Sequence, residues 1–204
     1  NIQQKKIINI FKEFSIQDAR QVKKIEKKTN HDVKAVELFI VEKLKKLKLN
    51  KLCEFVHFCC TSEDINNLSY SLMLQRFLNN EFLTEINFLQ KKLNSLAKKY
   101  SKVSMLAFTH GQPASPTTLG KEFSNFSYRI KFHLDLIKST NQKGKFNGAS
   151  GNYNAHIIAE KKVNWEALSK KFVNSLGLDF SSHSTQIELK DSMALQLTNT
   201  HNLN

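Results

Sequence analysis

The spacing of apolar residues is the feature that most constrains how this chain can fold. In its clearest stretch they recur every three or four positions: Leu119, Phe123, Phe126, Ile130, Leu134 and Ile137. This spacing puts the side chains on one face of an α-helix and does not fit the alternation of a β-strand. Because the 204 residues include only 6 Gly and 2 Pro, few turns interrupt such patterns. We therefore expect an all-α fold built from long helices.

The same pattern predicts helices along most of the chain. The expected helices are 5–14, 16–27, 33–47, a long one from Thr61 with a bend near Asn79-Asn80, about 25 residues from Leu119, 164–176, and one from near Glu188. The segments between them are polar, and we expect irregular structure at 103–117, 144–156 and 181–186. Long helices joined by polar loops are typical of a helix bundle, in which loops and helix ends carry the chemistry.

Charge and cysteine content narrow the class of protein. The formal net charge is +13, with the largest excess in residues 1–51. Such a surface suits an anionic ligand or nucleic acid, although a lysine-rich composition that keeps helices soluble is the simpler interpretation. The three cysteines, Cys53, Cys59 and Cys60, make no disulfide framework and favour a reducing compartment. With no signal peptide and no long apolar run, we expect a cytoplasmic protein without a membrane partner.

Three polar clusters interrupt the helical pattern and are candidate sites. They are Thr29-Asn30-His31-Asp32, His57 with Thr61-Ser62-Glu63-Asp64, and Thr109-His110-Gly111-Gln112-Pro113. The first two are also explained as helix caps, because short polar side chains accept hydrogen bonds from free N–H groups. The same helix starts can hold a carboxylate or phosphate. In the third cluster an imidazole sits in a constrained Gly-Pro turn, which makes His110 an acid–base candidate.

These strings, in this order, resemble the adenylosuccinate lyase family. The residues that carry the resemblance are 30–37 (Asn-His-Asp-Val-Lys-Ala-Val-Glu), 54–67 with its Thr-Ser-Glu-Asp core, 109–114, 120–122, 145–149, 151–156 (Gly-Asn-Tyr-Asn-Ala-His) and 185–188. The Thr-Ser-x-Asp and Thr-His-Gly-Gln elements occur across the fumarase/aspartase superfamily. The strings at 30–37 and 151–156 are more particular to bacterial-type adenylosuccinate lyases.

The resemblance implies a fumarate-releasing lyase of purine synthesis. Its substrates would be adenylosuccinate, giving AMP, and the succinyl-carboxamide intermediate SAICAR, giving AICAR. The family needs no metal or organic cofactor, and works as a homotetramer whose active sites are shared between subunits. No nucleic-acid partner is expected. The fold implied is fumarase/aspartase-like, with residues 1–60 ending a small helical N-terminal domain and residues 61–204 beginning the central helix bundle.

The resemblance also assigns roles to individual residues. His110 would be the general acid that protonates the leaving nitrogen. Thr61 and Ser62 would hold a carboxylate of the succinyl group at a helix start. The other substrate-binding residues would be Asn30, His31, Asp32, His57 and Gln186. The family's Ser-Ser-x-Met-Pro-x-Lys-x-Asn loop, whose serine is the expected base, is absent from this sequence. We therefore expect a fragment that does not turn over by itself.

Three alternatives remain open at this point. A lyase for another succinyl compound, such as argininosuccinate, disagrees with the string at 30–37. A basic helical module that binds RNA through residues 1–51 predicts salt-dependent affinity but leaves the Thr-His-Gly-Gln-Pro string unexplained. A truncated, inactive partner protein would expose apolar helix faces and associate through them.

Overall fold

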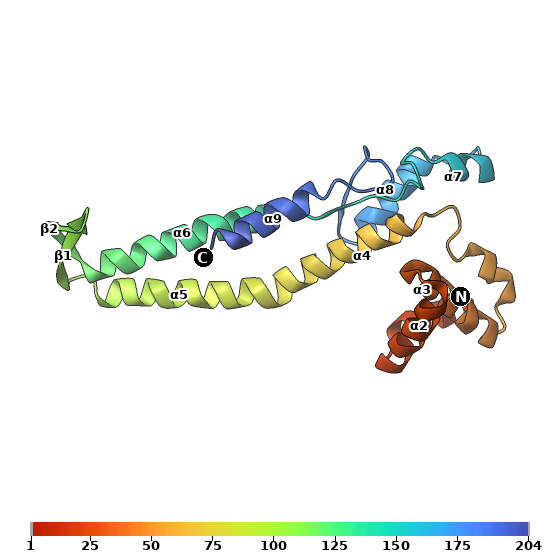
Figure 1. The fold of residues 1–204 in the computed structure, drawn as a ribbon, viewed down its shortest axis with the longest axis horizontal. Coiled ribbons are helices and arrows are strands. Elements are labelled where there is room, and N and C mark those ends of the chain that lie inside the picture. Colours follow the sequence, from red (N-terminus) through yellow and green to blue (C-terminus); the bar gives the residue numbers. More distant parts are fainter. Residues whose placement is uncertain (1, 204) are drawn as a thin grey trace. The chain divides into compact units, whose positions relative to one another are not determined.

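The computed structural model describes residues 2–203, and its regular structure is mostly helical, as predicted (Figure 1). The α-helices are α1 (Ile2–Lys12), α2 (Ile16–Thr29), α3 (Asp32–Lys46), α4 (Ser62–Phe77), α5 (Leu83–Lys99), α6 (Leu119–Ser139), α7 (Asn154–Ala159), α8 (Trp165–Ser175) and α9 (Asp191–His201). A 3₁₀-helix η1 (Asn50–Phe55) and a π-helix η2 (Leu78–Phe82) are also present. The strands are β1 (Ser104–Thr109), β2 (Gln112–Thr118), β3 (Lys143–Gly144) and β4 (Asp179–Phe180), paired as β1–β2 and β3–β4.

Contacts divide the chain into two compact units. Unit 1 comprises Asn1–Ser69, Gly144–Ser175 and Phe180–Glu188. Unit 2 comprises Tyr70–Lys143, Leu176–Asp179 and Leu189–Asn204. Each unit therefore collects segments that are distant in sequence. The sequence predicts a domain boundary between residues 60 and 61. That prediction refers to the domains of a longer enzyme, so the two units of this chain do not test it.

In unit 1, α2 and α3 pack against each other through a small apolar core and a polar clasp. Val33, Ala35, Phe39 and Leu44 of α3 are buried. The ring of Phe14 meets that of Phe39 edge-on at 5.8 Å. At the start of α2, Ser15 and Asp18 form a reciprocal capping box. Hydrogen bonds from Lys43 and Ser15 lower the pKa of Asp18 to about 2, so this carboxylate stays charged and holds the two helices together.

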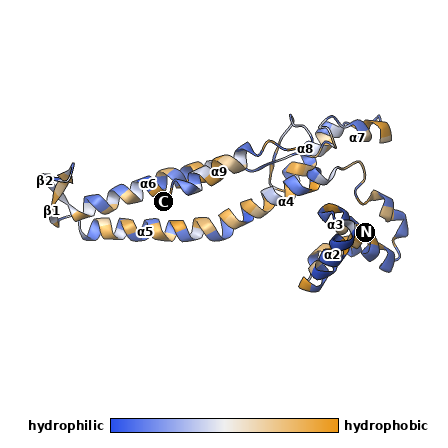
Figure 2. Cartoon of the chain, in the orientation of Figure 1, coloured by the Kyte–Doolittle hydropathy of each residue, from blue (hydrophilic) through white to orange (hydrophobic). Residues whose placement is uncertain are grey.

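In unit 2, α5 and α6 lie side by side, and α9 lies along α6 (Figure 1). Leu78, Leu134 and Ile137 are among the buried apolar residues of this unit. The predicted amphipathic helix is confirmed as α6, although it is shorter than expected, at 21 residues. Apolar bands remain along α5 and α6 in Figure 2, and many of their large side chains are exposed: Phe88, Leu89, Phe126, Tyr128 and Phe132.

Several local predictions were wrong, each for a physical reason. Residues 104–118 form a β-hairpin rather than an irregular segment, with a register irregularity between Leu106 and Phe108. Its prolines are tolerated because both strands of a two-stranded sheet are edge strands. The bend expected near Asn79-Asn80 is not one of these errors and stays a prediction: both residues lie in the π-helix η2, which joins α4 and α5. The short helices η1 and α7 were not predicted, since one or two turns carry too few residues to show a period.

Gly120 sets how closely α6 can approach the end of α5. A methyl group at this position would lie 2.4 Å from the carbonyl oxygen of Ala97 and 2.6 Å from Cα of Ser101. The main-chain N–H of Gly120 donates to the carbonyl of Tyr100 at 3.0 Å, so the backbones are held together there. These neighbours are backbone atoms, and they cannot turn away as a flexible side chain would.

We predict that Gly120→Ala destabilises the protein despite favouring the helix. Helix propensity favours alanine over glycine by about 1 kcal/mol, but overpacking against backbone costs about 1–3 kcal/mol. Thermal unfolding should therefore show a lower Tm for Gly120→Ala. The control is Ser124→Ala, at an exposed position of the same helix, which should keep or raise the Tm. A Tm for Gly120→Ala at or above that of the control would contradict the steric argument.

Candidate active site

The connection between α2 and α3 brings His31 against the start of α4. Asn30 ends α2 in the left-handed conformation (φ 52°), and its N–H donates to the carbonyl of Glu26 at 2.8 Å. His31 then caps α3, because its Nδ1 accepts from the N–H of Lys34 at 3.3 Å. Its other ring nitrogen, Nε2, lies 3.3 Å from the hydroxyl of Ser62. Two of the predicted site segments therefore meet through one imidazole.

Asp32 adds a second contact between the same two segments. One of its carboxylate oxygens accepts from the N–H of Val33 at 2.7 Å, in the first turn of α3. The other accepts from the side-chain amide of Asn66, on α4, at 3.4 Å. Asp32 is exposed, so this contact is weak, but it leaves the carboxylate able to bind a hydroxyl group of a ligand.

An open pocket lies where these residues meet. It has a volume of about 340 Å³ and is lined by His31, Lys34, Glu37, Val56, His57 and Ser62. A second open pocket, of about 690 Å³, is lined by Asn30, His31 and Asp32 together with Lys23, Glu26 and Lys27. Hydroxyl, imidazole and ammonium groups around one hollow suit an anionic ligand. The predicted residues Asn30, His31, Asp32, His57 and Ser62 thus line two pockets that share His31.

The start of α4 is capped by the buried carboxylate of Asp64. Its Oδ2 accepts from the N–H of Thr61 at 2.9 Å. Among the described residues, the hydroxyl of Thr61 makes no hydrogen bond, and it remains available to a ligand. Hydroxyls of Thr61 and Ser62 at the positive end of a helix dipole make a site for a carboxylate.

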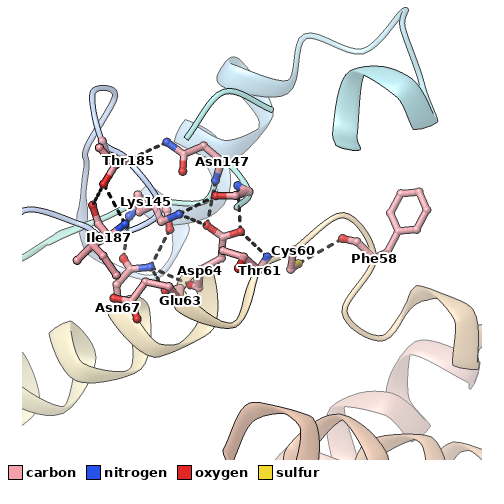
Figure 3. Close-up of polar contacts among 12 residues, drawn as sticks. Phe58, Cys60, Thr61, Glu63, Asp64, Asn67, Lys145, Asn147, Thr185 and Ile187 are labelled. Atoms are coloured by element: carbon pink, nitrogen blue, oxygen red, sulfur yellow. Dashed lines mark hydrogen bonds and ion pairs between the residues drawn. The ribbon is translucent and has the colours of Figure 1, made fainter. Parts of the chain in front are cut away.

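Asp64 and Lys145 form a fully buried ion pair, which the sequence analysis did not foresee (Figure 3). Both side chains are 0% exposed, and Nζ of Lys145 lies 3.0 Å from Oδ1 of Asp64. The same carboxylate accepts from the N–H groups of Asn147 at 3.1 Å and Gly148 at 3.0 Å. With Thr61, four donors surround it, which matches the acceptor capacity of a carboxylate.

Two asparagines extend this cluster to neighbouring segments. The side chain of Asn67 accepts from the N–H of Lys145 at 2.8 Å and donates to its carbonyl at 3.1 Å. The side-chain amide of Asn147 donates to the hydroxyl of Ser184 at 2.8 Å. Gly151 touches the same loop, since a methyl group there would lie 2.2 Å from the carbonyl oxygen of Ser184. Gln186 is exposed, two residues further along this loop.

The remaining predicted residue, His110, lies in unit 2. It forms the tip of the β1–β2 hairpin with Gly111, and both have positive φ, 52° and 73°. Positive φ at both central residues is typical of the tight turns that join two strands, and it explains why glycine follows the histidine. The imidazole is exposed. Among residues 2–203, no group of three or more His, Cys, Asp or Glu side chains could hold a metal ion.

A buried histidine, His156, packs behind the Gly148 loop. It is 1% exposed and lies edge-on to the rings of Phe146, Tyr153 and Trp165 at 6.1, 5.4 and 5.0 Å. Neither ring nitrogen has a hydrogen-bond partner in the described part of the chain. Burial lowers the pKa of His156, and the nearby charge of Asp64 offsets this only in part. The imidazole is therefore neutral in the folded protein near pH 7.

We predict that His156 makes the stability of the protein fall in mild acid. The unfolded state binds a proton at this side chain near pH 6.5, whereas the folded state does so only at a lower pH. Stability is therefore lost as the pH falls below about 6.5. The Tm of the wild type should drop more between pH 7.5 and pH 5.5 than that of His156→Phe, which keeps an aromatic ring. Parallel Tm curves for the two proteins would refute this role.

Known proteins of similar sequence are adenylosuccinate lyases. The chain is 48% identical over 187 residues to the adenylosuccinate lyase of Buchnera aphidicola subsp. Schizaphis graminum, covering 91% of this chain and 41% of that protein. It is 46% identical over 182 residues to the adenylosuccinate lyase of Escherichia coli K12, covering 89% and 40%. The chain thus spans about two fifths of the length of these relatives.

Solved structures with the same fold are more distant in sequence. β-Carboxy-cis,cis-muconate cycloisomerase from Acinetobacter calcoaceticus superposes with a TM-score of 0.73 at 16% identity, over 98% of this chain and 44% of that one. 3-Carboxy-cis,cis-muconate lactonizing enzyme from Pseudomonas putida gives 0.67 at 20%, over 83% and 37%. These likenesses confirm the expected fumarase/aspartase-like fold. The model of one protein family, described as lyase, matches residues 3–203, and the chain belongs to this lyase family.

Proposed function

We propose that this chain is part of an enzyme that releases fumarate from adenylosuccinate, giving AMP, and from SAICAR, giving AICAR. The observation that carries the proposal is the meeting of His31 with Ser62 beside the free Thr61 hydroxyl, in a chain 43–48% identical to adenylosuccinate lyases. The imidazoles of His31 and His57 and the hydroxyl of Ser62 line a pocket that can take an anionic group, and Lys34 in the same pocket is paired with Glu37.

In this proposal the chain's residues divide the work of an elimination. Thr61 and Ser62 bind a succinyl carboxylate at the start of α4, where the helix dipole stabilises the negative charge that grows on it. Asn30, His31 and Asp32 hold the nucleotide, while His57 and Gln186 contact the substrate. A base removes the proton from the carbon next to the carboxylate. The C–N bond then breaks with its electron pair on nitrogen, and His110 protonates that nitrogen.

The family resemblance leads us to propose a homotetramer with shared active sites, and the surface of unit 2 supports association. Its helices expose large apolar side chains, including Phe126 (57%), Tyr128 (73%) and Phe132 (56%) on α6 and Leu195 and Leu197 on α9. Large apolar side chains exposed on both helices support contact with another protein. We also propose a cytoplasmic location. No helix in the described residues is long and apolar enough to cross a membrane.

We predict that His110→Ala abolishes most of the turnover of adenylosuccinate. Loss of a general acid lowers kcat by about 10²–10⁴-fold while leaving KM nearly unchanged. The assay uses a parent protein, defined as a protein that contains this chain and has the length of its relatives. Fumarate release is followed by absorbance, with adenylosuccinate and, in parallel, argininosuccinate as the substrate. The control is His201→Ala, an exposed histidine near the end of α9. Undiminished turnover by His110→Ala, or release from argininosuccinate instead, would count against the proposal.

We predict that two inactive variants restore activity when they assemble together. If His110 and Ser62 of one active site come from different subunits, a mixture of His110→Ala and Ser62→Ala chains contains some sites with neither substitution. Equal amounts of the two chains should regain about a quarter of wild-type activity after co-expression, by random assortment. Recovery indistinguishable from zero would mean that both residues of a site come from one subunit.

A further inference from the structure

We propose that Asp64 and Lys145 are positioning residues for this elimination: the buried pair fixes the backbone of the substrate-binding segments without touching substrate. This inference rests on the proposed function. The pair belongs entirely to unit 1 and is 0% exposed, so no ligand reaches it. Its bonds lead instead to two segments that carry predicted substrate-binding residues, 61–62 and 184–186.

The first step of the argument is the completeness of the cluster. A buried carboxylate is costly unless every acceptor site is used. Asp64 meets this condition through the N–H groups of Thr61, Asn147 and Gly148 and the ammonium group of Lys145. A second bond from Lys145, to the carbonyl of Gly148 at 2.9 Å, keeps the ammonium group in place. Movement of any of these segments would leave a buried charge short of a partner.

The second step is the connection to the loop that carries Gln186. Asn147 donates one bond from its backbone to Asp64 and one from its side chain to Ser184. Gly151 lies close to the same loop, where a Cβ would come within 2.2 Å of the carbonyl oxygen of Ser184 and 2.9 Å of that of Thr185. A chain of two hydrogen bonds thus runs from the buried carboxylate to the Gln186 loop (Figure 3).

The third step concerns charge. The start of a helix attracts anions because its N–H groups are unpaired and its dipole is positive there. An uncompensated Asp64, three residues from Thr61, would repel the carboxylate that Thr61 and Ser62 are proposed to bind. Lys145 cancels this charge in the protein interior. The carboxylate of Asp64 therefore caps α4 and fixes its first residues, while Lys145 neutralises the charge of this carboxylate. The start of the helix can then still attract an anionic substrate.

The test compares Asp64→Asn, Lys145→Met and the double variant, by Tm and by steady-state turnover of adenylosuccinate in the parent protein. Each single change leaves a buried charge without its partner, so the Tm should fall in both. The double variant removes both charges and should regain most of the lost Tm. It should still show kcat/KM about 100-fold below wild type, because the segments are no longer held in the productive geometry.

A milder variant keeps the proposal testable if these proteins fail to fold. Ser184→Ala removes only the acceptor for the Asn147 side chain and should raise KM about fivefold, the effect of one hydrogen bond. Its control is Ser182→Ala, on the same loop, whose exposed hydroxyl lies 2.9 Å from Nδ1 of the neighbouring His183. Equal KM values for Ser184→Ala and its control would overturn the link to the Gln186 loop.

The outcomes separate this inference from the proposed function. Full recovery of both Tm and kcat/KM in the double variant, with an active wild type, would show that the pair serves stability alone and would overturn the inference. A wild type that releases no fumarate from adenylosuccinate would overturn the proposed function, and the inference with it. Recovery of Tm without recovery of kcat/KM is the result that supports positioning.

Discussion

The buried carboxylate of Asp64 is the constraint on which the local structure of unit 1 depends. A buried charge is stable only with a full set of partners, and three of the four partners here come from the distant residues 145–148. Residues 145–148 follow the short strand β3, which ends at Gly144, and form no helix or strand. Their conformation follows from the need to turn two N–H groups and one ammonium group toward Asp64.

This arrangement explains why the loops of unit 1 can be irregular and still well defined. Gly148 and Gly151 both have positive φ, 83° and 80°, which other residues adopt only with strain. Asn67 satisfies both backbone groups of Lys145, as a neighbouring strand would. Side chains therefore replace the hydrogen bonds that a sheet or helix would have supplied. Binding residues on such loops keep a fixed geometry.

The helices could be predicted from the sequence because their information is local. The apolar spacing of α6 and the cap at Asn30-His31 that separates α2 from α3 are visible within single stretches. Even there the outcome depends on packing partners: on α3 the larger Val36 is 40% exposed, whereas Ala35 is buried. Apolar spacing predicts which face can be buried, but the packing decides which residues are.

The ion pair of Asp64 with Lys145 could not be predicted, because its partners are far apart in sequence and each has an ordinary local explanation. Asp64 looks like a helix-start acid, and Lys145 is one of many lysines. The one available signal was a lysine next to a loop otherwise made of glycine, asparagine and small residues, where no helix face needs a solubilising charge. The sequence likewise did not predict that the segments at Asn30-His31-Asp32 and Thr61-Ser62 meet, because each was proposed as a candidate from its own local chemistry.

The similarities to known proteins agree with a division of the chain into helices that form the scaffold and loops that carry the candidate site. A fold likeness at 16% identity means that the helices tolerate extensive substitution while apolar spacing and volume persist. The identity of 48% to an adenylosuccinate lyase extends over 187 residues, or 91% of this chain. Since many activities share one fold, the loops must distinguish them. In this chain buried polar bonds hold the loop at 145–148 together with the aromatic packing around His156, and a buried polar bond is costly to leave without a partner. We therefore expect substitutions of Asp64, Lys145 and Asn147, which lie behind the proposed substrate-binding segments, to disturb the geometry of those segments.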